Sequence, residues 1–529
     1  MSGELIKLLR HLEDMPVKSE SIERTINELL FLKTKHAEDT DNYELNKAVG
    51  SLLADNYNTV EYADVFLINA VNENRDEPNR RKLLSTLAAV FEAFGDIERE
   101  EMVLRNACQH SPTMLDIKKL AEALLRLGEE EEASKIFRQV LDFYYQTALE
   151  HAQQRGGEVT QLLWPNIPIC SRFGEIAHCL DVYIKARKLG LTPKVNAILT
   201  TRPEWISNNV LLDYWREQHS DEVTILIDPT EAANAEEIYQ GCDLCIDILQ
   251  LPGDRTLHTN WASTEIWNLW ADADGSALLT LRDDHRKVSR EWMRQRGFPD
   301  NGWFAAFHIR EPGYHHETGK SPNRHRDSRV EDYFPAMKAI VDRGGWVVRI
   351  GDQSMTPLPE MEHVIDYTVS MEHDEVLDVF FCADAKFMVA VSSGGLAVAN
   401  VFGTPVLAVN MFPPGDYSYS RQDFYIHKHL RRRDTGKFLN AGEMVAPPLR
   451  LMLTPRHYEE QGLDVIPNTA EDIEEAVEEM MLRLNDEFEM SEQDQANVRR
   501  YRELNDYPGI RTPSAPTATF LRRYPHLVE

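Results

Sequence analysis

The sequence predicts an α/β protein in which two Rossmann-like domains follow an N-terminal all-α helical-repeat domain. Up to residue 154, apolar residues recur at spacings of three and four, which indicates helices. Beyond residue 160, short valine-rich runs without polar alternation alternate with helical patterns, as in parallel sheets covered on both faces. A chain of 529 residues is also too long for one core. We therefore expect a helical domain at 1–155, α/β domains at 160–295 and 300–485, and a C-terminal tail at 486–529.

Charge and composition narrow the class of protein. The 57 basic and 87 acidic residues give a net charge of -30, which disfavours nucleic acids and anionic membranes as partners. No apolar run approaches the ~18 residues of a membrane span, and the N-terminus lacks the pattern of a signal peptide. We expect a cytoplasmic protein. The six cysteines are too few for a disulfide framework, and Cys242 and Cys245 lie in an apolar segment, so we interpret them as core residues.

The helical region contains a weak internal repeat. Two predicted hairpins, 83–112 and 116–145, align so that Gly95 matches Gly128, 33 residues later. The second hairpin carries Ala133 and Phe137 in an A-x-x-x-F pattern, and the pair resembles a degenerate tetratricopeptide array. Stacked hairpins of that kind present a concave surface to a peptide or protein partner. The alternative, a helical domain that only packs against the next one, stays open.

The first α/β domain is predicted from a few elements. They are a strand-like run at 162–170, a helix at 176–188, strands at 194–199 and 223–227, and an aromatic segment at 261–270. Gly174 lies between the first strand and its helix, where a ligand group can meet a helix N-terminus. Single glycines are common at such turns, so this indication is weak.

The second α/β domain alternates strands and helices more densely. We expect strands at 304–309, 346–350, 387–391 and 406–409, and helices at 330–341 and 374–383, with a short helix between the last two strands. A further helix begins near Thr469, the predicted N-cap, with Asp472 at the capping-box position. After residue 485 the chain is polar, and its closing segment P-G-I-R-T-P-S-A-P, residues 508–516, looks irregular. A cleft between two such domains is where substrates bind.

Polar residues follow the first strand of this second domain. His308, Arg310 and Glu311 come directly at its carboxyl end. Arginine suits bidentate contact with a phosphate, and Glu311 or His308 could take a proton from a hydroxyl. The alternative is an ion pair that closes a loop. At the end of the next strand, Arg349, Gly351 and Asp352 are predicted to reach the same edge.

A Ser/Gly turn follows the strand at 387–391. It consists of Ser392, Ser393, Gly394 and Gly395 and leads into a short helix, whose N–H groups and dipole favour an anion. The alternative is a plain packing unit in which the serines only cap the helix.

Two cations follow in a segment that we expect to be helical. Arg421 and Lys428 lie within Y-S-R-Q-D-F-Y-I-H-K and suggest an anionic ligand in so acidic a protein, although Lys428 could lie on a solvated helix face. We expect no metal site, because the spacing of histidines 308, 315, 316 and 325 matches no ligand pattern. Asp272 and Asp274 form a D-x-D sequence that we interpret as a turn.

Four motifs in order carry a resemblance to a known family. The segments F-H-I-R-E-P-G-Y-H, G-G-W-V-V-R-I-G-D, V-S-S-G-G-L-A-V-A-N-V-F-G-T-P and Y-S-R-Q-D-F-Y-I-H-K, within residues 162–482, resemble a family of bacterial glycosyltransferases that helical repeats often precede. The H-x-R element is also similar to fucosyltransferases, and the S-G-G…G-T-P element to heptosyltransferases. The resemblance implies the GT-B architecture, with the nucleotide of a sugar donor on the C-terminal domain.

The resemblance also implies roles for individual residues. Its donor-site candidates are Arg310, Arg349, Ser393, Gly394 and Arg421, beside which we place Gly351, Asp352, Ser392, Gly395 and Lys428. Gly174 and Glu175 would line the acceptor side. Relatives favour a histidine after Gly174, whereas this chain has Glu175, so Glu175, His308 and Glu311 stay candidates for the catalytic base.

The expected function is that of a metal-independent glycosyltransferase with no cofactor, which moves a sugar from a nucleotide-sugar donor to a hydroxyl of a surface glycan or of a protein such as flagellin. The helical region would recruit the acceptor or a protein partner. An alternative is a non-catalytic scaffold with degenerate α/β domains. A third, a nucleotide-sugar epimerase or hydrolase, lacks the G-x-G-x-x-G fingerprint of a dinucleotide site.

Overall fold

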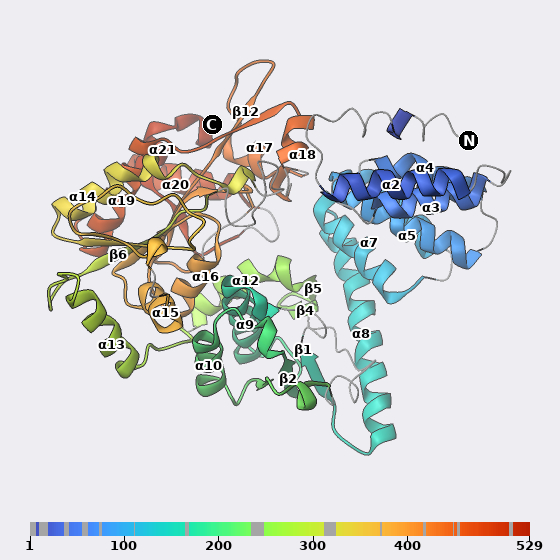
Figure 1. Cartoon of the computed structure of the whole chain (residues 1–529), viewed down its shortest axis with the longest axis horizontal. Coiled ribbons are helices and arrows are strands. Elements are labelled where there is room, and N and C mark those ends of the chain that lie inside the picture. The colour runs from blue at the N-terminus through green and yellow to red at the C-terminus, as the bar shows by residue number, and fades with distance from the viewer. Residues whose placement is uncertain are drawn as a thin grey trace. The chain divides into compact units, whose positions relative to one another are not determined.

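A computed structural model of the chain (Figure 1) describes residues 7–9, 20–35, 42–54, 62–73, 77–109, 112–163, 169–233, 248–273, 275–311, 324–370, 373–415, 419–447, 449–451, 455–506 and 511–529. The chain divides into two compact units, Met1–Val140 and Leu141–Glu529. The division falls inside one long helix, α8 (Glu130–Arg155), rather than at the predicted boundary near residue 155. Within the described residues, no helix is long and apolar enough to cross a membrane.

The first unit is all-α, as predicted. Its helices follow one another as α2 (Glu20–Lys35), α3 (Asn42–Ala54), α4 (Ala63–Glu73), α5 (Glu77–Phe94), α6 (Ile97–Cys108), α7 (Met114–Leu127) and the start of α8. Consecutive helices pack against each other from α2 to α7. Their apolar faces meet in a core of their own that includes Leu29, Val49, Leu67 and Phe91.

The predicted internal repeat corresponds to two consecutive helix pairs, α5–α6 and α7–α8, that are joined by equivalent turns. Gly95 and Gly128 both adopt left-handed backbone conformations, with φ of 68° and 89°. In each turn the N–H group after the glycine bonds to a carbonyl five residues back, at 3.0 and 2.8 Å, which is the bond that closes a Schellman cap. Ala133 and Phe137 are fully buried.

The second unit contains two α/β lobes. The first lobe, residues 160–273, holds a parallel sheet of order β1-β2-β3, formed by β1 (Thr160–Leu163), β2 (Asn196–Thr200) and β3 (Thr224–Leu226). Helix α9 (Phe173–Lys188) connects β1 to β2, and α10 (Asn209–Gln218) connects β2 to β3. The aromatic segment forms α12 (Thr259–Ala273), after the antiparallel pair β4 (Ile248–Leu251) and β5 (Arg255–His258). The pair Cys242 and Cys245 lies outside the described residues.

The second lobe, residues 283–529, is built on a seven-stranded sheet of order β14-β11-β10-β9-β6-β7-β8. Its strands are β6 (Phe304–His308), β7 (Trp346–Ile350), β8 (Val364–Asp366), β9 (Phe387–Ala390), β10 (Val406–Met411), β11 (Phe424–His427) and β14 (Ala515–Pro516), and all their pairings are parallel. The helices are α13 (Asp283–Arg294), α14 (Phe334–Asp342), α15 (Glu375–Ala383), α16 (Gly394–Val401), α17 (Ala441–Val445), α18 (Pro455–Glu460), α19 (Ala470–Leu484), α20 (Glu492–Leu504) and α21 (Ala518–Arg523). Strands β12 (His429–Arg432) and β13 (Leu463–Ile466) form an antiparallel pair beside them.

The predicted α/β class is therefore confirmed, and the sheet contains one switch point that matters for a ligand. Every residue of β9 and β10 is buried, as their unbroken apolar sequences require. The chain proceeds outward from β6 to β7 and β8 and then returns to β9, on the other side of β6. His308 pairs in register with Ile350 of β7 and with Ala390 of β9. In open parallel sheets, ligands bind at the carboxyl ends of the strands that flank such a switch point.

Two predictions about this lobe are wrong. The segment 419–428 is a turn and a strand, β11, rather than a helix. The buried Asp423 accepts the N–H groups of Tyr419 (3.1 Å), Ser420 (2.9 Å) and Val406 (2.8 Å), which fixes the turn and sets the strand beside β10.

The described residues within 486–529, which were predicted to be a C-terminal tail, belong to this lobe. They supply α20, α21 and the edge strand β14 of the large sheet. A capping box of Ser491 and Asp494 starts α20, just as the predicted box of Thr469 and Asp472 starts α19.

Candidate functional site

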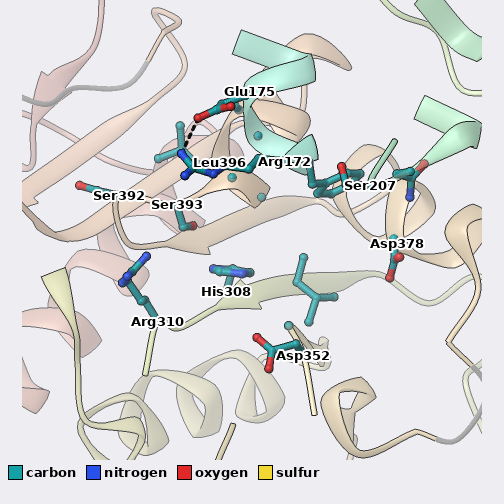
Figure 2. Close-up of a pocket in the computed structure, with 18 of the residues that line it drawn as sticks. Arg172, Glu175, Ser207, His308, Arg310, Asp352, Asp378, Ser392, Ser393 and Leu396 are labelled. Atoms are coloured by element: carbon teal, nitrogen blue, oxygen red, sulfur yellow. Dashed lines mark hydrogen bonds and ion pairs between the residues drawn. The ribbon is translucent and has the colours of Figure 1, made fainter. Parts of the chain in front are cut away.

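A cavity of about 840 Å³ lies at the carboxyl ends of β6 and β9 and is lined by residues of both lobes (Figure 2). The start of α9 and the residues before α10 line it from the first lobe, and the segments after β6, β7 and β9 line it from the second. Its volume is in the range of ~300–1,000 Å³ typical of small-molecule sites. The cavity is thus at the switch point of the large sheet.

Two helices begin at this cavity. Arg172 is the N-cap of α9 and Ser393 is the N-cap of α16, and neither side chain makes a capping hydrogen bond within the described chain. The first N–H groups of α16 have no acceptor within the helix, whereas in α9 the N–H groups of Glu175 and Ile176 donate to the carbonyl of Arg172 at 3.0 and 3.1 Å. Both helix starts carry the positive end of a helix dipole. Both helix starts are therefore open to an anionic ligand.

A pair of glycines brings these helix starts together. A Cβ atom on Gly174 would lie 2.3 Å from the Cα of Gly394, and one on Gly394 would lie 2.9 Å from the backbone nitrogen of Gly174. Both distances are shorter than any normal contact, so only glycine fits at either position. Gly174, which the sequence singled out for its turn, and Gly394 of the Ser/Gly turn thus form a close backbone contact between the lobes.

Cations and hydroxyl groups surround the start of α16. The Nε of Arg310 donates to Asp327 at 3.0 Å, and its side chain is 14% exposed. Arg326 donates to the carbonyl of Ser392. The buried Oγ of Ser393 has no hydrogen-bond partner among the described residues. In Figure 2, Arg310, Ser392 and Ser393 lie on the same side of the cavity. Arginine, a serine hydroxyl and a helix N-terminus together have the chemistry of a phosphate site.

His308 stands on the floor of the cavity, between Arg310 and Asp352 (Figure 2). Its Cδ2 lies 3.5 Å from the position that a Cβ would take on Gly395. Burial, with smaller contributions from the charges of Arg310 and Arg349, lowers the pKa of His308 to about 4, against the opposing effect of Asp352. The imidazole is therefore neutral near pH 7. Its Nδ1 is buried and has no hydrogen-bond partner among the described residues. The neutral ring can accept a hydrogen bond, and its lowered pKa makes it a weaker base than a free imidazole.

Glu311 and Arg349 form the ion pair that the sequence left open as an alternative. One carboxylate oxygen of Glu311 accepts from Arg349, and the other accepts the N–H of Thr356 at 3.0 Å. Arg349 is fully buried, donates to the carbonyl of Thr356 at 2.6 Å and lies 3.5 Å from Asp366. Glu311 lines the cavity, whereas Arg349 is not among its lining residues. The pair holds together the loops that follow β6 and β7.

The other two predicted cations also have structural partners. Arg421 is exposed and pairs with Asp272 of α12 in the first lobe. Lys428 is buried and donates to the carbonyls of His325 (2.8 Å) and Asp327 (2.7 Å), and burial lowers its pKa to about 8. Neither residue lines the cavity. Lys428 instead holds the segment that carries Arg326 and Asp327.

Three more predicted residues line the cavity: Glu175, Gly351 and Asp352. Glu175 pairs with Arg172 at 2.7 Å, and both side chains are largely exposed. Asp352 accepts the N–H of Ser354 at 2.8 Å. Gly351 has a positive φ of 154°, a backbone conformation that favours glycine in the turn after β7.

Sequence reasoning missed several lining residues, among them Arg326, His178, Tyr419 and Asp378. The Nδ1 of His178 lies 2.9 Å from the hydroxyl of Tyr419, whose ring stacks on Trp267 at 3.8 Å. His178 could have been found from its position one helical turn after Gly174. Arg326 gives no such signal.

The histidine cluster of the sequence is only partly described. His315, His316 and Asp274 lie outside the described residues. Within those residues, no group of three or more histidines, cysteines or carboxylates is arranged to hold a metal ion.

No family model and no curated protein matches the chain. Among solved structures, it is similar to a family 9 glycosyl transferase from Veillonella parvula (10% identity, 61% of this chain and 96% of that one, TM-score 0.34). ADP-heptose LPS heptosyltransferase II of E. coli gives 13% identity over 62% and 99% of the two chains, with a TM-score of 0.34. A Thermobaculum terrenum O-GlcNAc transferase gives 12% identity over 100% and 98%, with a TM-score of 0.27. All three TM-scores lie below 0.5.

Proposed function

We propose that the protein is a glycosyltransferase that moves a sugar from a nucleotide-sugar donor to a hydroxyl group of a glycan or protein acceptor. One observation carries the proposal: the start of α16, with Arg310 and Ser393, faces the same cavity as the neutral imidazole of His308. The first group is suited to a phosphate ester and the second to a hydroxyl proton. Transfer from a phosphate-linked sugar to an alcohol needs both.

The phosphates of the donor would lie on the N–H groups of α16, with Arg310 and Arg326 beside them. Charge builds up on the departing phosphate as the bond between the sugar carbon and the phosphate oxygen breaks. Donors that are already in place stabilise that charge without further rearrangement. The acceptor oxygen forms the new bond to the same sugar carbon and loses its proton.

Of the three candidate bases, we assign to His308 the role of taking the proton from the acceptor hydroxyl. Glu311 has both carboxylate oxygens in use, on Arg349 and on the N–H of Thr356. Glu175 is held by Arg172 at 2.7 Å. His308 lines the cavity, and its Nδ1 has no partner in the described part of the chain. It therefore needs to break no bond before it accepts a proton.

The test is ligand binding by the full chain, measured by thermal shift and calorimetry with UDP-, GDP-, ADP- and CMP-sugars. We expect at least one of them to stabilise the protein, and Arg310→Gln to weaken its binding about tenfold or more, because a charged hydrogen-bond donor is lost. Arg329→Gln is the matched control, since Arg329 is an exposed arginine of the same lobe that does not line the cavity. Failure of every nucleotide sugar to bind would contradict the proposal. Recruitment of the acceptor by the helical unit stays a prediction.

A further inference from the structure

The cavity has two ends of opposite character. Arg310, Ser392 and Ser393 lie at one end, and Ser207 and Asp378 lie at the other, with Asp352 near His308 between them (Figure 2). The first end offers positive charge and N–H groups. The second offers a carboxylate, which repels phosphate, and a hydroxyl, and both can accept hydrogen bonds from a ligand. A ligand that spans the cavity therefore has an anionic end and a hydroxyl-bearing end.

Asp378 differs from the other acidic residues around the site. Its carboxylate makes no hydrogen bond within the described part of the chain, whereas Glu311 and Asp423 of the same lobe are fully used by protein donors. Burial raises the pKa of Asp378 to about 6, because the ionised form lacks compensation from partners. His373 opposes this rise, and Asp374 and Glu375 add to it. The Asp378 carboxylate can therefore accept hydrogen bonds from a ligand in the cavity.

A contact between the lobes fixes the position of Asp378. It lies in the first turn of α15, three residues after Glu375. The carboxylate of Glu375 accepts the N–H groups of Asn209 (2.7 Å) and Val210 (3.1 Å) at the start of α10 in the first lobe. Asp378 is thereby held at the seam between the lobes, on the wall of the cavity.

We propose that Asp378 accepts hydrogen bonds from the hydroxyl groups of a sugar ring attached to the bound phosphate, and so sets the specificity of the site at this end. The inference rests on the proposed function. Two rings of a nucleotide sugar have this chemistry, the ribose and the transferred sugar. A carboxylate pairs well with either, because one carboxylate oxygen pair can accept from two neighbouring hydroxyls.

The experiment compares three kinds of probe by calorimetry: inorganic pyrophosphate, the nucleoside diphosphates UDP, GDP and ADP, and their sugars UDP-N-acetylglucosamine, GDP-mannose and ADP-glucose. The variant is Asp378→Asn, which keeps the shape and removes the charge. Asp342→Asn, on the exposed face of α14, is the control for net charge. We expect Asp378→Asn to weaken a sugar-bearing probe about tenfold and to leave pyrophosphate unchanged.

The probes separate the two sources of the ring. If Asp378→Asn already weakens the affinity for the nucleoside diphosphate, the ring that Asp378 contacts is the ribose. If it weakens only the affinity for the nucleotide sugar, that ring is the transferred sugar. Equal weakening of pyrophosphate, or no change with any probe that the wild type binds, would overturn the inference. If the wild type binds pyrophosphate but gains nothing from any nucleotide or sugar, the proposed function itself fails.

Thermal stability separates this role from a structural one. The pKa of Asp378 is raised in the fold, so its contribution to stability is present at low pH and is lost as the pH rises through about 6. At pH 8 the variant should therefore be at least as stable as the wild type. Lower stability at pH 8 without a selective loss of sugar-bearing probes would make Asp378 a structural residue.

Discussion

Replacement of Gly174 by alanine tests the contact on which the cavity depends. The new Cβ would lie 2.3 Å from the Cα of Gly394, and its other close neighbours are the backbone carbon and oxygen of that residue, both at 3.2 Å. No side chain can rotate to make room. Since carbon atoms pack at about 3.5–4.0 Å, the starts of α9 and α16 must separate by more than about 1 Å.

The cost follows from this displacement. Overpacking of a well-packed contact costs about 1–3 kcal/mol, and the upper end applies here because backbone meets backbone. In a unit of this size, a loss of about 3 kcal/mol lowers the unfolding temperature by roughly 4 °C. The same shift moves one helix N-terminus away from the other, so the affinity for a phosphate-bearing ligand should fall about tenfold or more.

The assay is a thermal unfolding scan together with calorimetry with pyrophosphate. Gly157→Ala is the matched control, because a Cβ on Gly157 has nothing within 4 Å. We expect the control to behave as the wild type does. If Gly174→Ala shows the same unfolding temperature and affinity as Gly157→Ala, the two lobes are not held by this contact and the reasoning is refuted.

Three further predictions concern the framework of the site. Glu375→Ala should lower the free energy of unfolding by about 1–2 kcal/mol, since α10 loses the acceptor of its first N–H groups, while Glu362→Ala, an exposed control, should not. Asp494→Asn should destabilise by a similar amount at pH 7; Arg522 holds the pKa of Asp494 well below its usual range, so the difference from the wild type should shrink as the pH falls below about 4. His308 has a lowered pKa, so the free energy of unfolding should decrease as the pH drops from about 6.5 to about 4, and a pH titration of His308→Gln should lack this component.

Local rules were enough to predict the elements around the Ser/Gly turn. The runs at 387–391 and 406–409 are unbroken and apolar, and they became β9 and β10, with α16 between them. The spacing of Gly95 and Gly128 alone predicted that they occupy equivalent positions in the repeat, and each follows a helix in the left-handed conformation. In such cases a few neighbouring residues decide the structure, so a sequence pattern is sufficient.

Long-range partners decided what the sequence could not predict. Arg349 was expected in the ligand site, but it pairs with Glu311, 38 residues earlier, and is completely buried. Lys428 is used by carbonyls about a hundred residues away in the chain. The segment around Asp423 became a strand because that carboxylate binds the backbone of β10. Spacing along the chain carries no information about such pairs.

These buried pairs change how the site attracts an anion. In a chain of net charge -30, three of the predicted cations serve the framework: Arg349, Lys428 and Arg421. In the cavity, the positive potential for an anion comes instead from the backbone N–H groups at the starts of α9 and α16, which a pair of glycines brings into contact. Arg310 and Arg326 lie beside them. Backbone N–H groups cannot be removed by side-chain substitution, so loss of either arginine should leave part of the anion affinity. Separation of the two helix starts should remove more of it than any single charge change.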